Sequence, residues 1–323
     1  MTARFCLSVL LASLALAGAA RSEDFPDRPI TFVVSFAPGG LTDIPARILA
    51  AEMQPRIGQP IVVENKPGAS GISGGNYVVR ASANGYTLLV SALSEVQNFY
   101  YLPVPYNALT DLAPVGKIVD GPPVVLVVNA NSPFKNVADL IAYAKANPSA
   151  ANFATSGAAT TPAIAVTQLN ALAGTTITPV PYNGTGPAAA AVVGGDVQGA
   201  FVFYPSAQGL IDAGQLRVLA IASSHRLAKL PDVPTMIELG FKDFEHDAFA
   251  GLSAPRDTPP AVIAALNKAI NETIASASFQ QRIAPLGMTA PPQPNAPGDY
   301  GRFMTKAAAY QGELAKLSAK PKL

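Results

Sequence analysis

Short β-rich runs alternate with helical runs along most of the chain, and this alternation constrains the fold more than any other feature. Parallel strands need a crossover between them, usually a helix, so the pattern predicts an α/β protein. With 323 residues, the chain is long enough for two packed lobes. The predicted strands cover residues 30–35, 61–64, 87–91, 115–119, 124–129, 152–154, 178–181, 197–203 and 216–222.

Capping residues mark several helix boundaries. Asn136 is followed three residues later by Asp139, a pairing that predicts the start of a helix. Two amphipathic helices, predicted at residues 259–277 and 297–318, close the chain. We expect this last pair of helices to cover a sheet rather than to line a site.

The junction between the first strand and the following helix predicts an anion-binding site. The first N–H groups of a helix have no partner inside it and carry the positive end of the helix dipole. A glycine-containing loop at that position lets an anion approach the backbone closely. The candidate ligand-binding residues of this loop are Phe36, Ala37, Gly39, Gly40, Leu41, Thr42 and Asp43.

Two further strand-to-helix junctions, at residues 154–162 and 181–187, repeat this combination of small residues, hydroxyls and a helix start. Ordinary N-capping explains any one such loop, because Ser and Thr are common caps. Three of them favour a binding site, since ligands of open α/β sheets lie beyond the carboxyl ends of strands. The candidates from the second loop are Thr155, Ser156, Gly157, Thr160 and Thr161.

None of these loops contains Lys, Arg or His. A bound carboxylate would therefore be held by backbone N–H groups and by the hydroxyls of Thr42, Ser156 and either Thr160 or Thr161. Such neutral contacts suit a protein that must release what it captures. Asp43 could pair with the amino group of an amino-acid ligand. The favoured interpretation is that Asp43 is an ordinary carboxylate in the first turn of a helix, stabilised by the helix dipole. Amino acids therefore rank below simple carboxylates as ligands.

Aromatic residues near the junctions are candidate walls of the site. These are Phe36, Tyr182, Phe203 and Tyr204. For any single aromatic residue, ordinary core packing remains the better interpretation, because burial is the usual fate of aromatic side chains.

Composition excludes several classes of function. The net charge is only +1 and charged residues make up 13% of the chain, which argues against a nucleic-acid surface or a polybasic membrane patch. The single cysteine, Cys6, lies near the N-terminus. We therefore expect no disulfide and no cysteine-bound metal in the mature protein. No phosphate loop or dinucleotide fingerprint is present, so no cofactor is expected.

The N-terminus has the features of a secretory signal peptide. Arg4 precedes an apolar stretch at residues 7–17, and small residues follow at 17–20. The apolar stretch is shorter than the roughly 20 residues that a membrane-spanning helix needs, so a retained anchor is the weaker alternative. We expect residues 1–22 to be removed and the mature protein to be periplasmic.

An esterase is the alternative from a different functional class. Residues 71–75 match the G-x-S-x-G string of the α/β-hydrolase nucleophile elbow, with Ser73 as the serine. An elbow places its serine directly after a strand, whereas residues 64–68 intervene here. Neither His225 nor His246 has the spacing of a metal ligand. We therefore expect no enzyme activity.

An ordered set of motifs resembles the Bug or TctC-like family, the extracytoplasmic solute-binding receptors of tripartite tricarboxylate transporters. The motifs span nearly the whole mature chain. They are PDRPI (26–30), the loop at 36–43, GQPIVVENKPGASG (58–71), NGYTLL (84–89), DLAPVGKIV (111–119), VPYNGTGPA (180–188), LPDVPTM (230–236) and GLSAP (251–255).

The resemblance implies a two-lobed clamshell of the type II-like periplasmic binding protein class, with discontinuous domains. One lobe would combine residues 23–122 with 248–323, and the other would hold residues 123–247. The resemblance also implies that the loops at 36–43 and 155–161 clasp a ligand carboxylate from opposite lobes. The implied partners are a small organic carboxylate and the membrane permease subunits. A receptor that reports its ligand to a membrane sensor instead of a permease is the alternative.

Departures from the family pattern bear on the ligand. Leu41 stands where relatives commonly have Ser, and Ala163 stands where they often have His. Both changes make the site less polar. We therefore expect a preference for an aromatic or otherwise largely apolar carboxylate over aspartate, glutamate or citrate.

Overall fold

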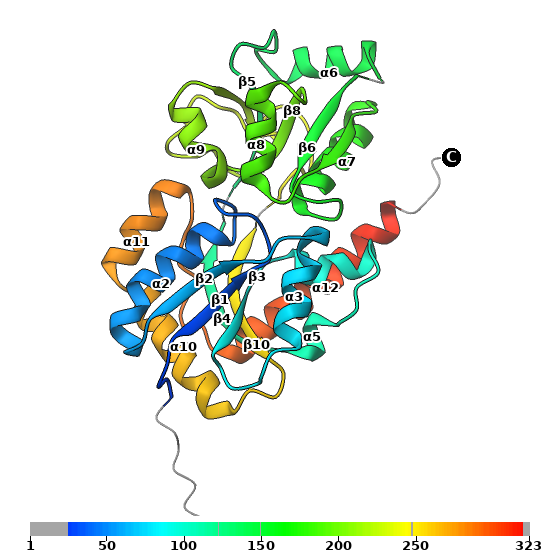
Figure 1. The fold of residues 1–323 in the computed structure, drawn as a ribbon. Helices are drawn as coiled ribbons and strands as arrows, with labels where there is room; N and C mark the ends of the chain where they lie inside the picture. The colour runs from blue at the N-terminus through cyan, green and yellow to red at the C-terminus, as the bar shows by residue number, and fades with distance from the viewer. Residues whose placement is uncertain (1–24, 122, 149, 247, 319–323) are drawn as a thin grey trace, which may run out of the picture.

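The computed structural model describes residues 25–318 apart from 122, 149 and 247. It contains two five-stranded sheets, each covered by helices (Figure 1). The predicted signal peptide lies outside the described residues. So do residues 122 and 247, on which the predicted lobe boundaries fall, and the exact division therefore stays a prediction.

The first sheet combines strands from both ends of the chain. Its order is β2–β1–β3–β10–β4, in which β1, β2 and β3 are parallel and β10 is antiparallel to both of its neighbours. The strands are β1 (Ile30–Val34), β2 (Ile61–Asn65), β3 (Thr87–Ser91), β4 (Leu112–Asp120) and β10 (Phe249–Pro255).

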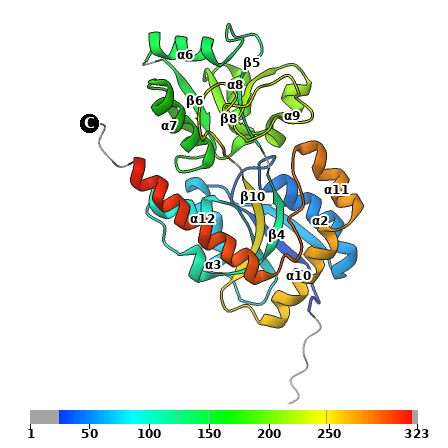
Figure 2. The same ribbon diagram turned by 180° about the vertical axis from the view of Figure 1, so that it is seen from behind.

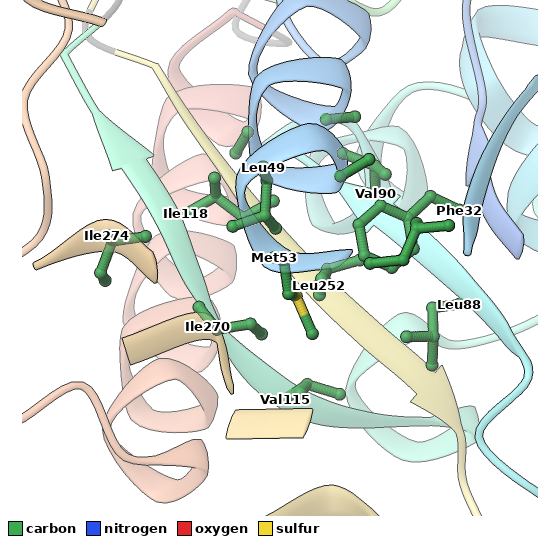
Figure 3. Close-up of a cluster of buried hydrophobic side chains, with 14 of the residues drawn as sticks. Phe32, Leu49, Met53, Leu88, Val90, Val115, Ile118, Leu252, Ile270 and Ile274 are labelled. Atoms are coloured by element: carbon green, nitrogen blue, oxygen red, sulfur yellow. The ribbon is translucent and has the colours of Figure 1, made fainter. Parts of the chain in front are cut away.

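Helices cover both faces of this sheet (Figures 1 and 2). On one face, Leu49 and Met53 of α2 and Ile270 of α10 pack against Phe32 and other strand residues (Figure 3). On the other face, α3 and α12 pack against the alternate strand residues. The helices of this lobe are α2 (Asp43–Ile57), α3 (Ile72–Val79), α4 (Ser94–Gln97), α5 (Ala108–Asp111), α10 (Pro260–Ile274), α11 (Ala277–Ile283) and α12 (Pro297–Ser318).

The second sheet uses only the middle of the chain. Its order is β7–β6–β8–β5–β9, with β6 parallel to β7 and β8 and with β5 antiparallel to β8 and β9. The strands are β5 (Val124–Asn129), β6 (Asn152–Thr155), β7 (Thr178–Pro181), β8 (Gly199–Phe203) and β9 (Leu216–Ile221). Its helices are α6 (Val137–Ala146), α7 (Thr161–Ala173), α8 (Thr185–Gly194) and α9 (Tyr204–Asp212).

The two segments that connect the lobes run beside each other. The N–H of Gly121, which follows β4, donates to the carbonyl of Ala248, which precedes β10 (2.9 Å). Gly121 has a φ of +72°, a backbone conformation that glycine adopts without steric cost. The polypeptide therefore crosses between lobes at one paired position, as a clamshell requires.

The predicted elements agree with the structure except at one strand. Each predicted strand is present within a few residues, and Asn136 caps α6 by accepting the N–H of Asp139 (2.9 Å). The strand β10 was missed, because its sequence lacks polar alternation. All of its residues are buried between β3 and β4, so no polar face marks it. The helix predicted at 259–277 ends at Ile274, and α11 follows separately.

No helix among the described residues is both long and apolar enough to cross a membrane.

Candidate functional site

A small cavity lies between the two lobes, where the loops at the carboxyl ends of their strands face each other. Its volume is about 30 Å³, which is room for about two water molecules. The residues that line it are Phe36, Gly40, Leu41, Ala92, Leu93, Ser94, Ser156, Thr160, Thr161, Thr185 and Phe203.

The cavity gathers about half of the residues predicted from the sequence. Those that line it are Phe36, Gly40, Leu41, Ser156, Thr160, Thr161 and Phe203. The other predicted residues do not line it. They are Ala37, Gly39, Thr42, Asp43, Thr155, Gly157, Tyr182 and Tyr204.

Asp43 organises the first loop from behind the cavity. Its carboxylate is buried and accepts hydrogen bonds from the N–H of Gly39 (2.9 Å), from Nδ2 of Asn65 (2.8 Å) and from Nε of Arg47 (3.0 Å). Burial alone would raise the pKa of Asp43. The hydrogen bonds from Arg47, Gly39 and Asn65 outweigh burial and hold that pKa below its ordinary value. The side chain is therefore engaged within its own lobe.

The first loop offers fewer free N–H groups than its sequence indicated. The N–H of Gly39 is bonded to Asp43, and the N–H of Ala37 donates across the cleft to the carbonyl of Asn183 (2.9 Å). In the described part of the chain, the N–H groups of Leu41 and Thr42 have no acceptor, whereas the N–H of Gly40 lies in a turn with the carbonyl of Ala37. The N–H groups of Leu41 and Thr42 directly precede α2, where an anion is favoured.

The second loop has an internal chain of hydroxyl hydrogen bonds. Ser156 Oγ donates to Thr160 Oγ1 (3.0 Å), and Thr160 Oγ1 donates to the carbonyl of Gly157 (2.9 Å). The N–H groups of Ser156 and Gly157 have no acceptor within the described residues. In this closed arrangement, backbone N–H groups rather than these two hydroxyls are the available donors.

Sequence reasoning missed a further loop, which follows β3. Ala92, Leu93 and Ser94 from this loop line the cavity. The neighbouring Glu95 is buried and accepts the N–H of Ala92 (2.6 Å) and the hydroxyl of Ser94 (3.1 Å) on Oε2. The loop could have been found by the rule already applied to β1, since β1 and β3 are adjacent parallel strands whose carboxyl ends share one edge.

Thr185 was also missed as a lining residue. It opens α8, and its hydroxyl lies 2.6 Å from that of Ser206. The junction that contains Thr185 was recognised in the sequence, but Tyr182 was chosen from it. Tyr182 is part-buried and packs against the core of the second lobe, as does the fully buried Tyr204. Neither tyrosine lines the cavity.

Several contacts hold the lobes together around the cavity. Gln97 Nε2 donates to the carbonyl of Ala159 in the opposite lobe (2.6 Å). Gly157, with a φ of +140°, lies so close to Ser70 that an added Cβ would be 2.7 Å from Ser70 Oγ. The close approach of the lobes thus depends on a glycine in the second loop.

Comparison with known proteins agrees with this geometry. Residues 45–318 match the family model described as "Tripartite tricarboxylate transporter family receptor". The chain belongs to this family. The receptor is 36% identical over 286 residues to Protein BugT of Bordetella pertussis, covering 88% of this chain and 87% of the relative. It is 37% identical over 287 residues to a UPF0065 protein of Pseudomonas sp. strain P51, covering 86% and 85%.

Solved structures of similar proteins share the two-lobed fold. The periplasmic binding protein BugD is 32% identical with a TM-score of 0.87, covering 91% of this receptor and 98% of BugD. MatC of Rhodopseudomonas palustris, with bound malate, is 32% identical with a TM-score of 0.85, covering 90% and 100%. Rpa4515 of R. palustris, with adipate, is 30% identical with a TM-score of 0.86, covering 91% and 98%. The family resemblance and the predicted fold class are both confirmed.

The structure places the G-x-S-x-G serine away from an elbow. Ser73 is exposed and lies in the first turn of α3, and no hydrogen bond joins it to a histidine among the described residues. His246 lies near the lobe connection, where burial lowers its pKa to about 4. The described residues contain no group of His, Cys, Asp and Glu that could hold a metal ion.

Proposed function

We propose that this receptor captures a small organic carboxylate between its lobes in the periplasm and delivers it to the membrane permease subunits of a tripartite tricarboxylate-type transporter. The supporting observation is the set of N–H groups without acceptors on both sides of the cavity. Among the described residues they belong to Leu41 and Thr42 on one lobe and to Ser156 and Gly157 on the other. The malate and adipate in the related structures are also carboxylates.

The carboxylate site would use neutral donors only. None of the described Lys, Arg, His, Asp or Glu residues lines the cavity. An anion would be stabilised by helix-start N–H groups in a cleft that excludes water, where each hydrogen bond is stronger than it would be in water. Such a site binds without a buried ion pair and releases its ligand when the lobes separate and water returns.

Apolar walls would surround the rest of the ligand. Leu41 and Ala92 from the first lobe pack in one cluster with Phe203 from the second, and Phe36 and Leu93 complete the lining. We propose that these side chains favour an aromatic or otherwise largely apolar carboxylate over aspartate, glutamate or citrate.

Binding of acids and their amides tests the charge requirement. Mature protein is first screened by thermal shift against aliphatic and aromatic acids, because a ligand that binds only the native state raises the melting temperature. Each acid that binds is then compared with its amide by calorimetry. We expect the amide to bind more weakly by several kcal/mol, since charge-assisted hydrogen bonds contribute about 1.5–3 kcal/mol each. Equal affinities for an acid and its amide would contradict the proposed carboxylate site.

A further inference from the structure

Three of the five hydroxyl groups that line the cavity donate their hydrogens within the protein, whereas the hydroxyl of Thr161 has no partner among the described residues. A serine or threonine hydroxyl has one hydrogen to donate and two lone pairs that accept. Ser156 donates its hydrogen to Thr160, and Thr160 donates to the carbonyl of Gly157. Ser94, from the loop after β3, donates to Oε2 of Glu95. These three lining hydroxyls can offer only lone pairs to a ligand.

The orientation of Ser94 is fixed by Glu95. Oε2 of Glu95 accepts both the Ser94 hydroxyl and the N–H of Ala92, and Oε1 has no partner among the described residues. Burial raises the pKa of Glu95 to about 7. The nearby titratable groups are the phenols of Tyr106 and Tyr300, which supply no positive charge. A proton on Oε1 would leave Oε2 able to accept both hydrogen bonds, so Ser94 keeps its orientation in either state.

The cavity therefore has two kinds of polar surface. The free N–H groups of the loops before α2 and α7 donate, whereas the loop after β3 accepts through Ser94. A second carboxylate next to Ser94 would face lone pairs without a donor, which is unfavourable in a closed cleft. A ligand hydroxyl would satisfy Ser94, and it carries no charge that the uncharged lining would leave unpaired.

We propose that this receptor selects carboxylates that carry a hydroxyl group, with Ser94 as the hydrogen-bond acceptor for that hydroxyl and Glu95 as the residue that positions Ser94. This inference rests on the proposed capture of a carboxylate and specifies the ligand further. It assigns a specificity role to the β3 loop that is separate from the carboxylate-holding role of the other loops.

Matched sets of acids test the proposal by calorimetry. The sets are succinate, malate and aspartate; butyrate, 3-hydroxybutyrate and 3-aminobutyrate; and benzoate with 3-hydroxybenzoate. We expect the hydroxy acid to bind about three- to tenfold more tightly than its hydroxyl-free parent in each set that binds, the effect of one net hydrogen bond. The amino analogue should bind no more tightly than the parent.

Variants separate positioning from general stability. Ser94→Ala should reduce the preference for the hydroxy acid over its parent to about onefold. Glu95→Gln should keep the preference, since its amide oxygen can still accept both hydrogens, and Glu95→Met should lose it. Ser224→Ala, an exposed serine outside the cavity, is the matched control and should change nothing.

The outcomes distinguish a failure of the proposed carboxylate capture from a failure of the proposed hydroxyl selectivity. If none of these acids binds, the proposed carboxylate capture is overturned, and the hydroxyl selectivity falls with it. If acids bind without a preference for hydroxy acids, if Ser94→Ala leaves the preference intact, or if the amino analogue binds most tightly, only the hydroxyl selectivity is overturned. Loss of the preference in Ser94→Ala together with its retention in Glu95→Gln would support the assignment.

Discussion

Replacing Asp43 by asparagine tests whether one buried carboxylate holds the first binding loop. Asp43 is 2% exposed and fixes Gly39, Asn65 and Arg47 around it. Asparagine keeps one acceptor oxygen but turns an NH₂ group toward these donors. The Arg47 side chain is 49% exposed, so water replaces most of that interaction and its contribution is discounted. The remaining contacts predict a loss of about 2–3 kcal/mol in the free energy of unfolding.

Asp299→Asn is the matched control. Asp299 also lies in the first turn of a helix and also pairs with an arginine, Arg302, but the Asp299 side chain is 38% exposed and that of Arg302 is 76% exposed. Its replacement should cost less than about 1 kcal/mol. Urea unfolding with linear extrapolation measures both variants against the native protein. A loss for Asp43→Asn no larger than that for Asp299→Asn would refute the structural role of the buried carboxylate.

The pH dependence of the Asp43 effect has a definite sign. The folded-state pKa of Asp43 is lowered from 3.8, so its stabilising contribution is present above that value and is lost as the pH falls through the folded pKa. The stability difference between native protein and Asp43→Asn should therefore narrow below about pH 4. Because Asp43 fixes the loop rather than the ligand's variable part, the variant should also weaken every bound carboxylate by a similar factor.

Other perturbations address closure, selectivity and processing. Gly157→Ala should weaken carboxylate binding by about 1–3 kcal/mol in calorimetry, because of its φ of +140° and its contact with Ser70. Gly174→Ala is the control, because Gly174 has a φ of +65° and open space around it, and this variant should leave binding unchanged. Equal losses of affinity in the two glycine variants would contradict the role of Gly157 in lobe contact. Leu41→Ser should weaken the binding of an aromatic acid by about 1–2 kcal/mol and so lower the ratio of its affinity to that of citrate. An unchanged ratio would contradict the apolar site. N-terminal sequencing of periplasmic protein should find a start within a few residues of Ala20, whereas an unprocessed chain in the membrane fraction would contradict cleavage.

The sequence predicted the fold well wherever local patterns and packing agree. The strand and helix periods, the Asn136 cap and the final helix at Pro297–Ser318 were all readable from residue types. The strand β10 was not, because Phe249–Pro255 is buried on every side and its small residues resemble a connection. Its place between β3 and β4 arises from a return of the chain from the second lobe, which no local pattern encodes.

The candidate site was predicted less completely, because strand order decides which loops meet. The loops after β1 and β6 were identified from their glycines, hydroxyls and helix starts. The loop after β3 has the same position relative to its strand, but its Ala92, Leu93 and Ser94 gave no comparable signal. Tyr182 and Tyr204 lie beside lining residues in the sequence, yet both pack against the core of the second lobe. Position next to a recognised junction therefore located the site but did not identify which aromatic side chains line it.

The polarity of the site depends on tertiary contacts even where its residues are known. The sequence shows an N–H at Ala37 and at Gly39, but Asn183 and Asp43 accept them once the chain has folded. It shows a hydroxyl at Ser156, but a neighbour four residues later takes its hydrogen. Among the described residues, what remains for a ligand is a few N–H donors on each lobe, the hydroxyl of Thr161 and the hydroxyl of Ser94, which accepts. A carboxylate would accept from these donors, and a hydroxyl group on the same ligand would donate to Ser94. The proposed specificity therefore depends on which N–H and hydroxyl groups remain without a partner after folding.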